Sequence, residues 1–321
     1  MVNTTLGRRR FLAAAGLGAA SLAGFAARAN GVKAAEVPAR KFYTVLSCGR
    51  LGVKASFQES VDLAVKHGFE GVDPDPGFFS QLSDDGLKKL LDELKSKHLR
   101  LGAAGLPVEF RKDNLTFSEG LQKLPSVANV LQKVGVARVT TWITPCSDDL
   151  TYLQNFRMHA YRLRACAEVL KEHGQRLGLE YVGPKTSWRS KRHPFIHTLS
   201  ETKELIVAIG TGNVGVQLDT WHWFNAEESA QDLLTLHNEE IITVDLNDAP
   251  AGIPLDRQMD LSRELPAATG VIPVKVFLDA LRSIGYDGPI HAEPFNAALR
   301  ALPRDEACAA TAAAMRKALA L

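Results

Sequence analysis

Four carboxylic acids in this chain each end a short, largely apolar segment. They are Glu180, Asp219, Asp245 and Glu293. An apolar run that ends abruptly in a carboxylate is typical of a buried strand whose last residue reaches a polar edge. Four carboxylates that met at one edge would repel one another unless a divalent cation lay among them. The repeated pattern therefore predicts a metal site.

A closed barrel of parallel strands would bring these acids together. We predict strands at 42–47, 69–73, 100–104, 137–143, 177–181, 214–218, 241–246 and 289–292, and helices at 56–67, 81–97, 117–134, 153–175, 200–208, 227–236, 273–284 and 303–319. Eight strand–helix alternations indicate an α/β protein with a single (β/α)8 TIM-barrel domain, whose active site lies at the carboxyl ends of the strands. An open doubly wound sheet is the alternative, although no Gly-x-Gly-x-x-Gly follows the first strand.

Residues 1–29 resemble a secretion signal rather than part of the fold. Arg8 and Arg9 form a twin-arginine pair, and residues 13–27 carry no charge. Small-residue cleavage sites follow at 27–29 and 33–35. We expect export by the twin-arginine pathway to the periplasm or the extracellular space. An uncleaved membrane anchor is the alternative, but the segment is short for a bilayer span. The rest of the chain contains no run of eighteen apolar residues, so we expect no stable membrane insertion after signal removal.

The charge of the chain depends on this signal. Residues 1–29 hold four arginines and no acid, so their removal changes the formal net charge from +2 to −2. The basicity of the full chain is therefore no indication of a nucleic-acid surface. The four cysteines form no Cys-x-x-Cys pair, which argues against a zinc ribbon or a redox motif. We expect free, buried thiols.

The segments around the four acids resemble those of the xylose-isomerase-like barrels. That superfamily includes sugar isomerases, ketose 3-epimerases, inosose dehydratases and a DNA-repair endonuclease. The resemblance covers residues 41–321 and implies a barrel domain with a divalent-metal-dependent sugar isomerase or epimerase activity. The segments that carry it are Leu-Glu180-Tyr-Val-Gly-Pro, Gln-Leu-Asp219-Thr-Trp-His222, Val-Asp245-Leu-Asn-Asp248-Ala-Pro and Ala-Glu293-Pro-Phe.

The resemblance also implies a ligand set for Mn²⁺ or Mg²⁺, namely Glu180, Asp219, Asp245 and Glu293. In the epimerase branch the position of Asp245 usually holds a histidine, so direct ligation by Asp245 stays open. An all-oxygen set favours a hard ion over zinc. The family's arginine after this strand is absent as well, and Arg263 is a candidate replacement on the same long loop.

The implied chemistry removes a proton next to a sugar carbonyl and returns it at another face or atom. A divalent cation stabilises the enediolate that forms, and a carboxylate on each side can act as base and acid. We assign these catalytic roles to Glu180 and Glu293, because they would flank the ion. Either residue alone could simply be a salt-bridge partner in a loop.

Five residues are candidates for substrate binding. His222 lies one turn beyond Asp219, where it could hydrogen-bond a hydroxyl or only pack beside its neighbouring tryptophans. The other four lie on two long connections, at about 183–199 and 247–272, whose length is typical of functional loops. Residues 185–192 could equally form a solvated basic face. The five candidates are His222, His197, Lys185, Arg263 and Trp188.

Export limits the expected substrate to compounds found outside the cytoplasm. Sugar phosphates are cytoplasmic metabolites, so we expect a free sugar, a keto-sugar or a glycoside. Elimination or hydration of a 3-keto-glycoside on the same metal site is an alternative reaction. A non-catalytic sugar-binding barrel is a further alternative, because Asp245 and the missing arginine depart from the family pattern. We expect no nucleic-acid partner, and a homodimer stays open.

Overall fold

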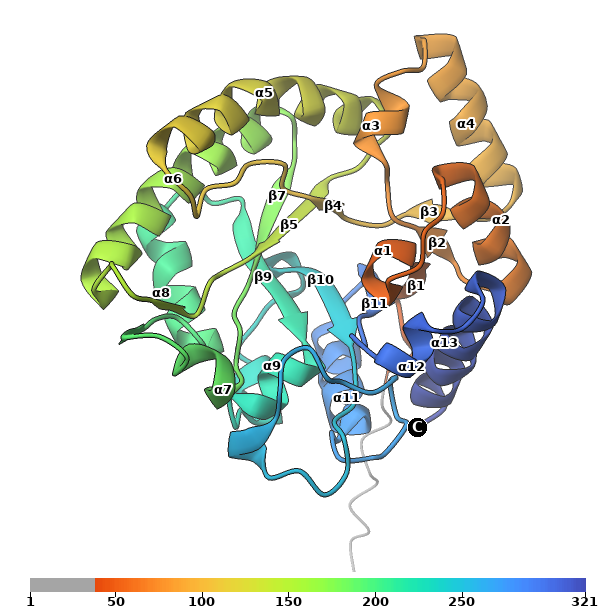
Figure 1. The fold of residues 1–321 in the computed structure, drawn as a ribbon. Coiled ribbons are helices and arrows are strands. Elements are labelled where there is room, and N and C mark those ends of the chain that lie inside the picture. Colours follow the sequence, from red (N-terminus) through yellow and green to blue (C-terminus); the bar gives the residue numbers. More distant parts are fainter. Residues whose placement is uncertain (1–37) are drawn as a thin grey trace, which may run out of the picture. The chain divides into compact units, whose positions relative to one another are not determined.

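Parallel strands form a closed barrel in the computed structural model, which describes residues 38–321 (Figure 1). The (β/α)8 fold predicted from the sequence is confirmed. The predicted signal at 1–29 lies outside the described residues. The barrel strands are β1 (Tyr43–Leu46), β2 (Gly71–Val72), β3 (Arg100–Leu101), β4 (Ala104–Gly105), β5 (Arg138–Trp142), β7 (Arg176–Glu180), β9 (Val214–Asp219), β10 (Ile241–Leu246) and β11 (Pro289–Ala292).

The barrel closes at one interrupted strand. β3 pairs with β2, β4 pairs with β5, and only Gly102 and Ala103 separate β3 from β4. These two short strands therefore act as the halves of the third barrel strand. β1 pairs in parallel with β11, so the first and last strands are neighbours. This closure excludes the open-sheet alternative and brings all strand ends to one rim.

Helices surround the barrel (Figure 1). The long ones are α2 (Phe57–His67), α4 (Asp84–Ser96), α5 (Asn114–Lys133), α6 (Tyr152–Glu172), α8 (Leu199–Ile209), α11 (Val274–Ile284) and α13 (Arg304–Leu319). Short helices lie in the connections, namely α1 (Cys48–Leu51), α3 (Pro76–Phe79), α7 (Lys185–Trp188), α9 (Thr220–Asn225), α10 (Ala230–Leu233) and α12 (Ala297–Arg300). The strands β6 (Cys146–Ser147) and β8 (His193–Pro194) pair separately in antiparallel fashion.

One predicted helix is much shorter than expected. The helix predicted at 227–236 is reduced to α10, and the left-handed conformation of Glu227, with a φ of 58°, accounts for its later start. A non-glycine residue in that region interrupts a right-handed helix. Asp113 and Thr198 cap α5 and α8 by accepting from the N–H groups of Thr116 and Glu201, so these helices begin earlier than predicted.

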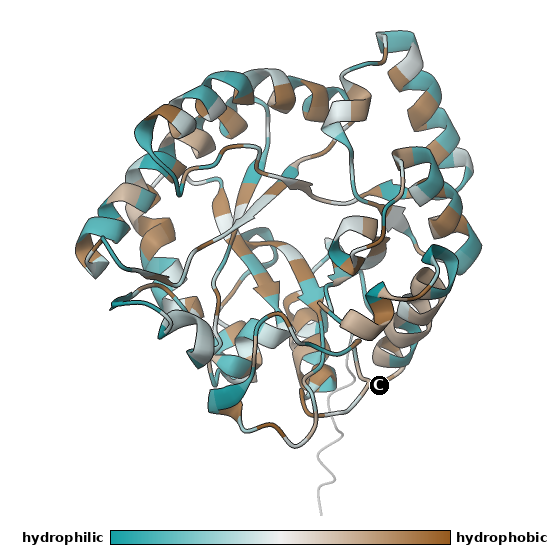
Figure 2. Cartoon of the chain, viewed as in Figure 1, coloured by the Kyte–Doolittle hydropathy of each residue, from teal (hydrophilic) through white to brown (hydrophobic). Residues whose placement is uncertain are grey.

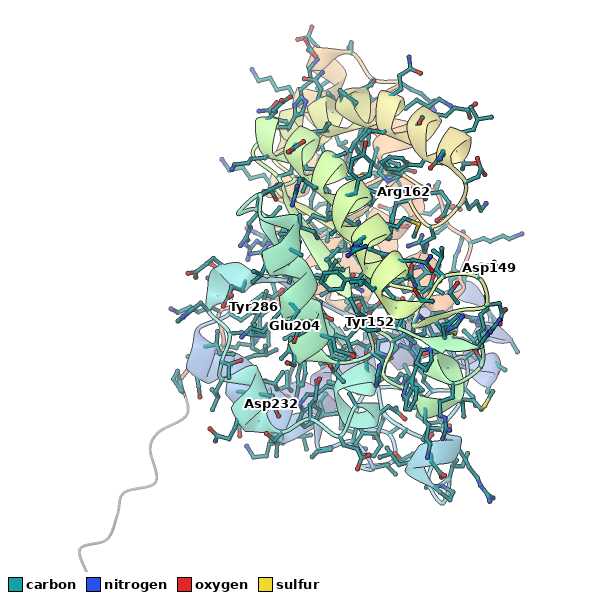
Figure 3. The ribbon with its side chains drawn as sticks, turned by 90° about the vertical axis from the view of Figure 1, so that its left-hand side faces the viewer. Asp149, Tyr152, Arg162, Glu204, Asp232 and Tyr286 are labelled. Carbon is teal, nitrogen blue, oxygen red and sulfur yellow. The ribbon has the colours of Figure 1, made fainter. Side chains whose placement is uncertain are left out.

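Apolar side chains from the strands and the surrounding helices form the buried core. The helix ribbons in Figure 2 carry both hydrophobic and hydrophilic colours. Figure 3 labels Tyr152 and Arg162 of α6, of which Arg162 is buried. The Arg162 guanidinium donates to the carbonyl oxygens of Phe110 (2.7 Å) and Lys112 (2.5 Å), which fixes the segment before α5. Among residues 38–321, no helix combines the length and the apolarity that crossing a membrane requires.

Candidate metal and substrate site

The strand ends bring the four predicted acids together. Glu180 ends β7, Asp219 ends β9 and Asp245 lies on β10 beside Asp219 in register. Glu293 directly follows β11. One carboxylate oxygen from each of the four lies within 4.8 Å of the others. Asp219 and Asp245 are fully buried, and the Glu293 side chain is only 14% exposed.

Two buried arginines reach into this cluster from separate loops. Arg50, on α1, donates to Asp245 Oδ2 at 2.5 Å and to Glu293 Oε1 at 3.4 Å. Arg263, in the loop after β10, donates to Asp219 Oδ2 at 2.8 Å and to Glu293 Oε2 at 3.2 Å. Glu293 is thus held between the two guanidinium groups, one on each carboxylate oxygen.

Neutral amides complete the positioning of the acids. Gln217, two residues before Asp219, donates from Nε2 to Glu180 at 3.0 Å and to Asp245 at 2.7 Å. The Asn247 amide donates to Asp219 Oδ1 at 2.8 Å. The acids are therefore fixed by donors on β9 and directly after β10 as well as by the two arginines, so that the protein alone positions them.

Burial and mutual repulsion make the ionised cluster unfavourable by itself. Burial first, and then the neighbouring carboxylates, raise the pKa of Glu180 well above its usual range. Burial raises the pKa of Asp219 to about 7, although the Arg263 charge opposes the change. Burial also raises the pKa of Glu293, against the effect of Arg50. These carboxyl groups must therefore bind either protons or further positive charge.

A divalent cation fits this donor set. Two guanidinium groups balance at most two of the four carboxylate charges, which leaves room for two further positive charges. Asp245 Oδ1 is buried and has no hydrogen-bond partner among the described residues. Carboxylate oxygens are the ligands that hard divalent ions prefer. Glu180, Asp219 and Glu293 would hold the ion, with Asp245 beside them.

Asp245 is held through one of its two carboxylate oxygens. Its Oδ2 atom accepts from both Arg50 and Gln217, and its Oδ1 atom lies 3.6 Å from His291 Nδ1. His291 in turn contacts Asp73 Oδ1 at 2.8 Å. Any ligation by Asp245 would use Oδ1, since Oδ2 is already engaged by two donors.

His222 lies at the same site in an uncharged form. Its Nδ1 atom accepts from the Gly183 N–H at 3.3 Å, and its Nε2 atom lies 3.4 Å from the Arg263 guanidinium. Burial, and then the Arg263 charge, lower the pKa of His222 to about 3. The imidazole can therefore form hydrogen bonds at neutral pH but does not carry a proton as a cation.

A cavity of about 680 Å³ opens beside the cluster. Of the four acids, Glu180 and Glu293 line it, whereas Asp219 and Asp245 do not. Arg263 and His222 also line it, as predicted for substrate contacts. Trp142, which is paired in register with Glu180, forms part of the same wall. The cavity is thus bounded at its inner end by the two acids to which we assigned proton transfer.

Three further predicted residues lie elsewhere on the long loop after β7. His197 and Trp188 stack on each other, with ring centroids 4.5 Å apart. Lys185 Nζ lies 3.9 Å from Asp256. None of the three is among the residues that line the cavity. Their contact with a substrate stays a prediction.

Some residues of the site were missed from the sequence. Gln217 could have been predicted from the sequence, because a polar residue inside a buried apolar strand needs a polar partner. Arg50 had only a weak signal, since an arginine shortly after a strand is common on any surface. Asp260, which accepts from Arg263 at 2.8 Å, had none that we can identify. Chain order alone does not reveal that these residues converge.

Known proteins share this fold and part of this sequence. Residues 61–318 match the family model described as "Xylose isomerase-like TIM barrel". An inosose isomerase of Bacillus velezensis is 21% identical over 250 residues, which cover 75% of this chain and 84% of the relative. A xylose isomerase domain protein of Alicyclobacillus acidocaldarius superposes with a TM-score of 0.75 at 29% identity, covering 87% of this chain and 98% of that one.

A third comparison concerns a metal-containing structure. The IOLI protein, solved with a bound zinc atom, superposes with a TM-score of 0.71 at 18% identity. The match covers 87% of this chain and 98% of that protein. At this identity the likeness establishes the shared fold.

Proposed function

Because the chain belongs to the xylose isomerase-like TIM barrel family, we propose that it is a divalent-metal-dependent sugar isomerase or epimerase. The reaction would remove a proton from the carbon next to a carbonyl and form an enediolate. The observation that carries this proposal is the division of the acid cluster. Glu180 and Glu293 face the cavity, whereas Asp219 and Asp245 are buried behind them.

Glu180 and Glu293 would combine ion binding with proton transfer, whereas Asp219 lies away from the cavity and would serve the ion alone. Glu180 and Glu293 can each reach a carbon held in the cavity, so one can take the proton and the other can return it. His222 offers its Nε2–H group to a substrate oxygen, because its Nδ1 atom accepts from Gly183, and Arg263 adds positive charge to the same wall. A divalent ion, proposed to be Mn²⁺ or Mg²⁺, would stabilise the negative charge that develops when the proton leaves.

The relatives support this choice of chemistry. The curated relatives at 21–24% identity carry the name inosose isomerase, and the structural neighbour IOLI holds a zinc atom. Elimination or hydration of a 3-keto-glycoside starts from the same proton removal and is our second candidate. We also propose that residues 1–29 direct export by the twin-arginine pathway.

Hydrogen–deuterium exchange tests the reaction directly. The protein is incubated in D₂O with Mn²⁺ and a panel of ketoses, inososes and 3-keto-glycosides, and NMR follows exchange next to the carbonyl. Glu180→Gln and Glu293→Gln should each lower exchange by at least about a hundredfold, because an amide can ligate but cannot accept the proton. Both variants should still bind metal at saturating Mn²⁺, although more weakly, because each exchanges a charged ligand for a neutral one.

Glu239→Gln is the matched control, because Glu239 is exposed and distant from the cavity lining. It should exchange at the rate of the unmodified protein. Undiminished exchange in both Glu180→Gln and Glu293→Gln would contradict the assignment of these two residues. Absence of exchange with every compound, in protein that holds metal, would favour a sugar-binding barrel.

A further inference from the structure

We infer that the outer part of the cavity accommodates an aromatic aglycone, so that the substrate is an aryl glycoside rather than a free sugar. This inference rests on the proposed function for the reacting end of the cavity. It adds a second subsite, formed by residues that have no part in proton transfer.

The cavity has two chemically different ends. Its inner end carries Glu180, Glu293 and Arg263, which suit a polyhydroxylated ring. Its outer wall carries Trp142, Met259 and Leu261. These three side chains are 45%, 58% and 72% exposed, although all are large and apolar. Large apolar side chains gathered around one cavity mark a surface that is covered by an apolar ligand.

Trp142 is held as a rigid platform. The Arg111 guanidinium lies 4.5 Å from the centre of the indole ring and donates to the Trp142 carbonyl oxygen at 2.7 Å. Glu109 pairs with Arg111 at 2.9 Å and fixes it in turn. A fixed, exposed indole ring binds a planar aromatic group at little cost in side-chain entropy.

Met259 and Leu261 belong to an equally fixed segment. Between them, Asp260 turns inward and accepts from Arg263 at 2.8 Å. Just before them, the Gln258 carbonyl oxygen accepts from Thr186 Oγ1 at 2.6 Å. The backbone is therefore anchored on both sides, and the two apolar side chains project from it at the cavity. Their exposure is not the result of a loose loop.

The same wall is unsuited to a phosphate group. Lys191 and Arg263 are the cationic side chains that line the cavity within the described part of the chain. Lys191 lies 4.0 Å from Asp148, and Arg263 is engaged by Asp219, Asp260 and Glu293. A phosphate site typically combines several converging cationic donors, and this wall offers one half-exposed lysine beside a guanidinium that three acids already engage.

The apolar part of the outer wall matches an aromatic ring better than a second sugar ring. Sugar hydroxyl groups that lay on Met259 and Leu261 would find no strong hydrogen-bond partner in these two side chains. A volume of about 680 Å³ is in the range of sites that enclose ligands larger than one monosaccharide. An aromatic group attached to the reacting sugar satisfies both conditions.

Calorimetric titration measures the contribution of this subsite. The full chain, loaded with Mn²⁺, is titrated with the para-nitrophenyl and the methyl glycosides of the same 3-keto-glucose. The aryl compound should bind roughly tenfold more tightly, because its ring buries apolar surface on Trp142 and Leu261. Trp142→Ala and Leu261→Ser should each remove most of this preference and leave the affinity for the methyl compound unchanged.

Leu115→Ser is the matched control for Leu261→Ser. Leu115 is 69% exposed, which is close to the value for Leu261, but it lies on α5 away from the cavity. This variant should keep the full preference for the aryl compound. Loss of the preference in Leu115→Ser as well would overturn the assignment to the outer wall.

Further outcomes separate this inference from the proposed function. Equal affinity for the two glycosides in the unmodified protein would overturn the aglycone subsite, whatever exchange is observed. Tighter binding of a keto-disaccharide than of the aryl compound would also overturn it. An aryl preference without deuterium exchange at any compound would support the subsite and contradict only the proposed reaction.

Discussion

Arg50 provides the positive charge that the aspartate at position 245 pairs with. A protonated histidine at this place would be repelled by the neighbouring guanidinium group, whereas an aspartate forms an ion pair with that group. Arg50 lies 2.5 Å from Asp245. This contact explains why an aspartate rather than a histidine suits this position. The two residues form one unit, in which a cation from α1 compensates an acid from β10.

Asp219 is the residue whose loss should affect the metal most. Asp219→Asn should lower affinity for Mn²⁺ and activity together, each by at least about tenfold, because a charged ligand is replaced by a neutral one. Metal content after dialysis and titration calorimetry measure the first effect. Asp256→Asn, which alters only an exposed partner of Lys185, is the control. Unchanged metal content in Asp219→Asn would contradict the site.

Removal of the Arg50 charge should have the opposite effect on the metal. Arg50→Met leaves Asp245 and Glu293 without this cation, so affinity for Mn²⁺ should rise by about tenfold. Calorimetry checks the change, with the exposed Arg157→Met as the control. A fall in affinity would mean that Arg50 is needed to position the acids rather than to balance their charge.

Among single residues, the sequence predicted the acids but not what holds them. The acids were readable because each interrupts an apolar run at a strand end. Gln217, Asn247 and Arg50 act through contacts with residues far away in the chain, at separations of 28 residues and more. Such contacts follow from barrel closure, which local patterns do not describe.

Among the elements, the interrupted third strand is closely packed at Gly102. A Cβ atom on Gly102 would lie 2.6 Å from Asp73 Oδ1 and 2.9 Å from Val45 Cγ1. Gly102→Ala should therefore lower the free energy of unfolding by about 1–3 kcal/mol through overpacking. Urea denaturation measures this change.

Gly105→Ala provides a control within the same strand. Nothing lies within 4 Å of the Cβ atom that this substitution would add. Its free energy of unfolding should stay within about 0.5 kcal/mol of the unmodified protein. Equal destabilisation of both variants would show that chain flexibility, rather than crowding at Asp73, governs the effect.

The elements themselves were largely predictable from hydrophobic period and capping. The long helices and all barrel strands lie at the predicted places, because their burial patterns are strong and regular. The helix predicted at 227–236 was wrong in length, since the left-handed backbone of Glu227 prevents a helix from starting at that residue. Short helices such as α1 and α9 were missed, because one turn contains too few residues for a periodic signal.

At the scale of the whole molecule, metal binding should raise thermal stability. A ligand that binds the folded chain at a concentration a hundredfold above its dissociation constant adds about 2.7 kcal/mol. A chelator should therefore lower Tm by several degrees, as measured by calorimetry. No change in Tm on chelation would contradict a metal-binding fold.

The gain in Tm should also depend on pH. Without a cation the pKa of Asp219 is raised to about 7, so below pH 7 the ion must displace a proton, and above it the carboxylate is free. The metal-induced rise in Tm should hence be larger at pH 8 than at pH 6. The reverse order would indicate that the carboxylates of the cluster do not take up protons in the metal-free fold.

Pairing of the first and last strands also sets the order of events during synthesis. The ribosome synthesises the four acids one after another, and Glu293 is added only when most of the chain has been translated. At roughly 5–20 residues per second, several seconds pass between the translation of Glu180 and that of Glu293. Since β1 must wait for β11, the complete set of ligands forms only when the chain is nearly finished. An ion bound at this site would therefore come from the compartment in which that last strand docks.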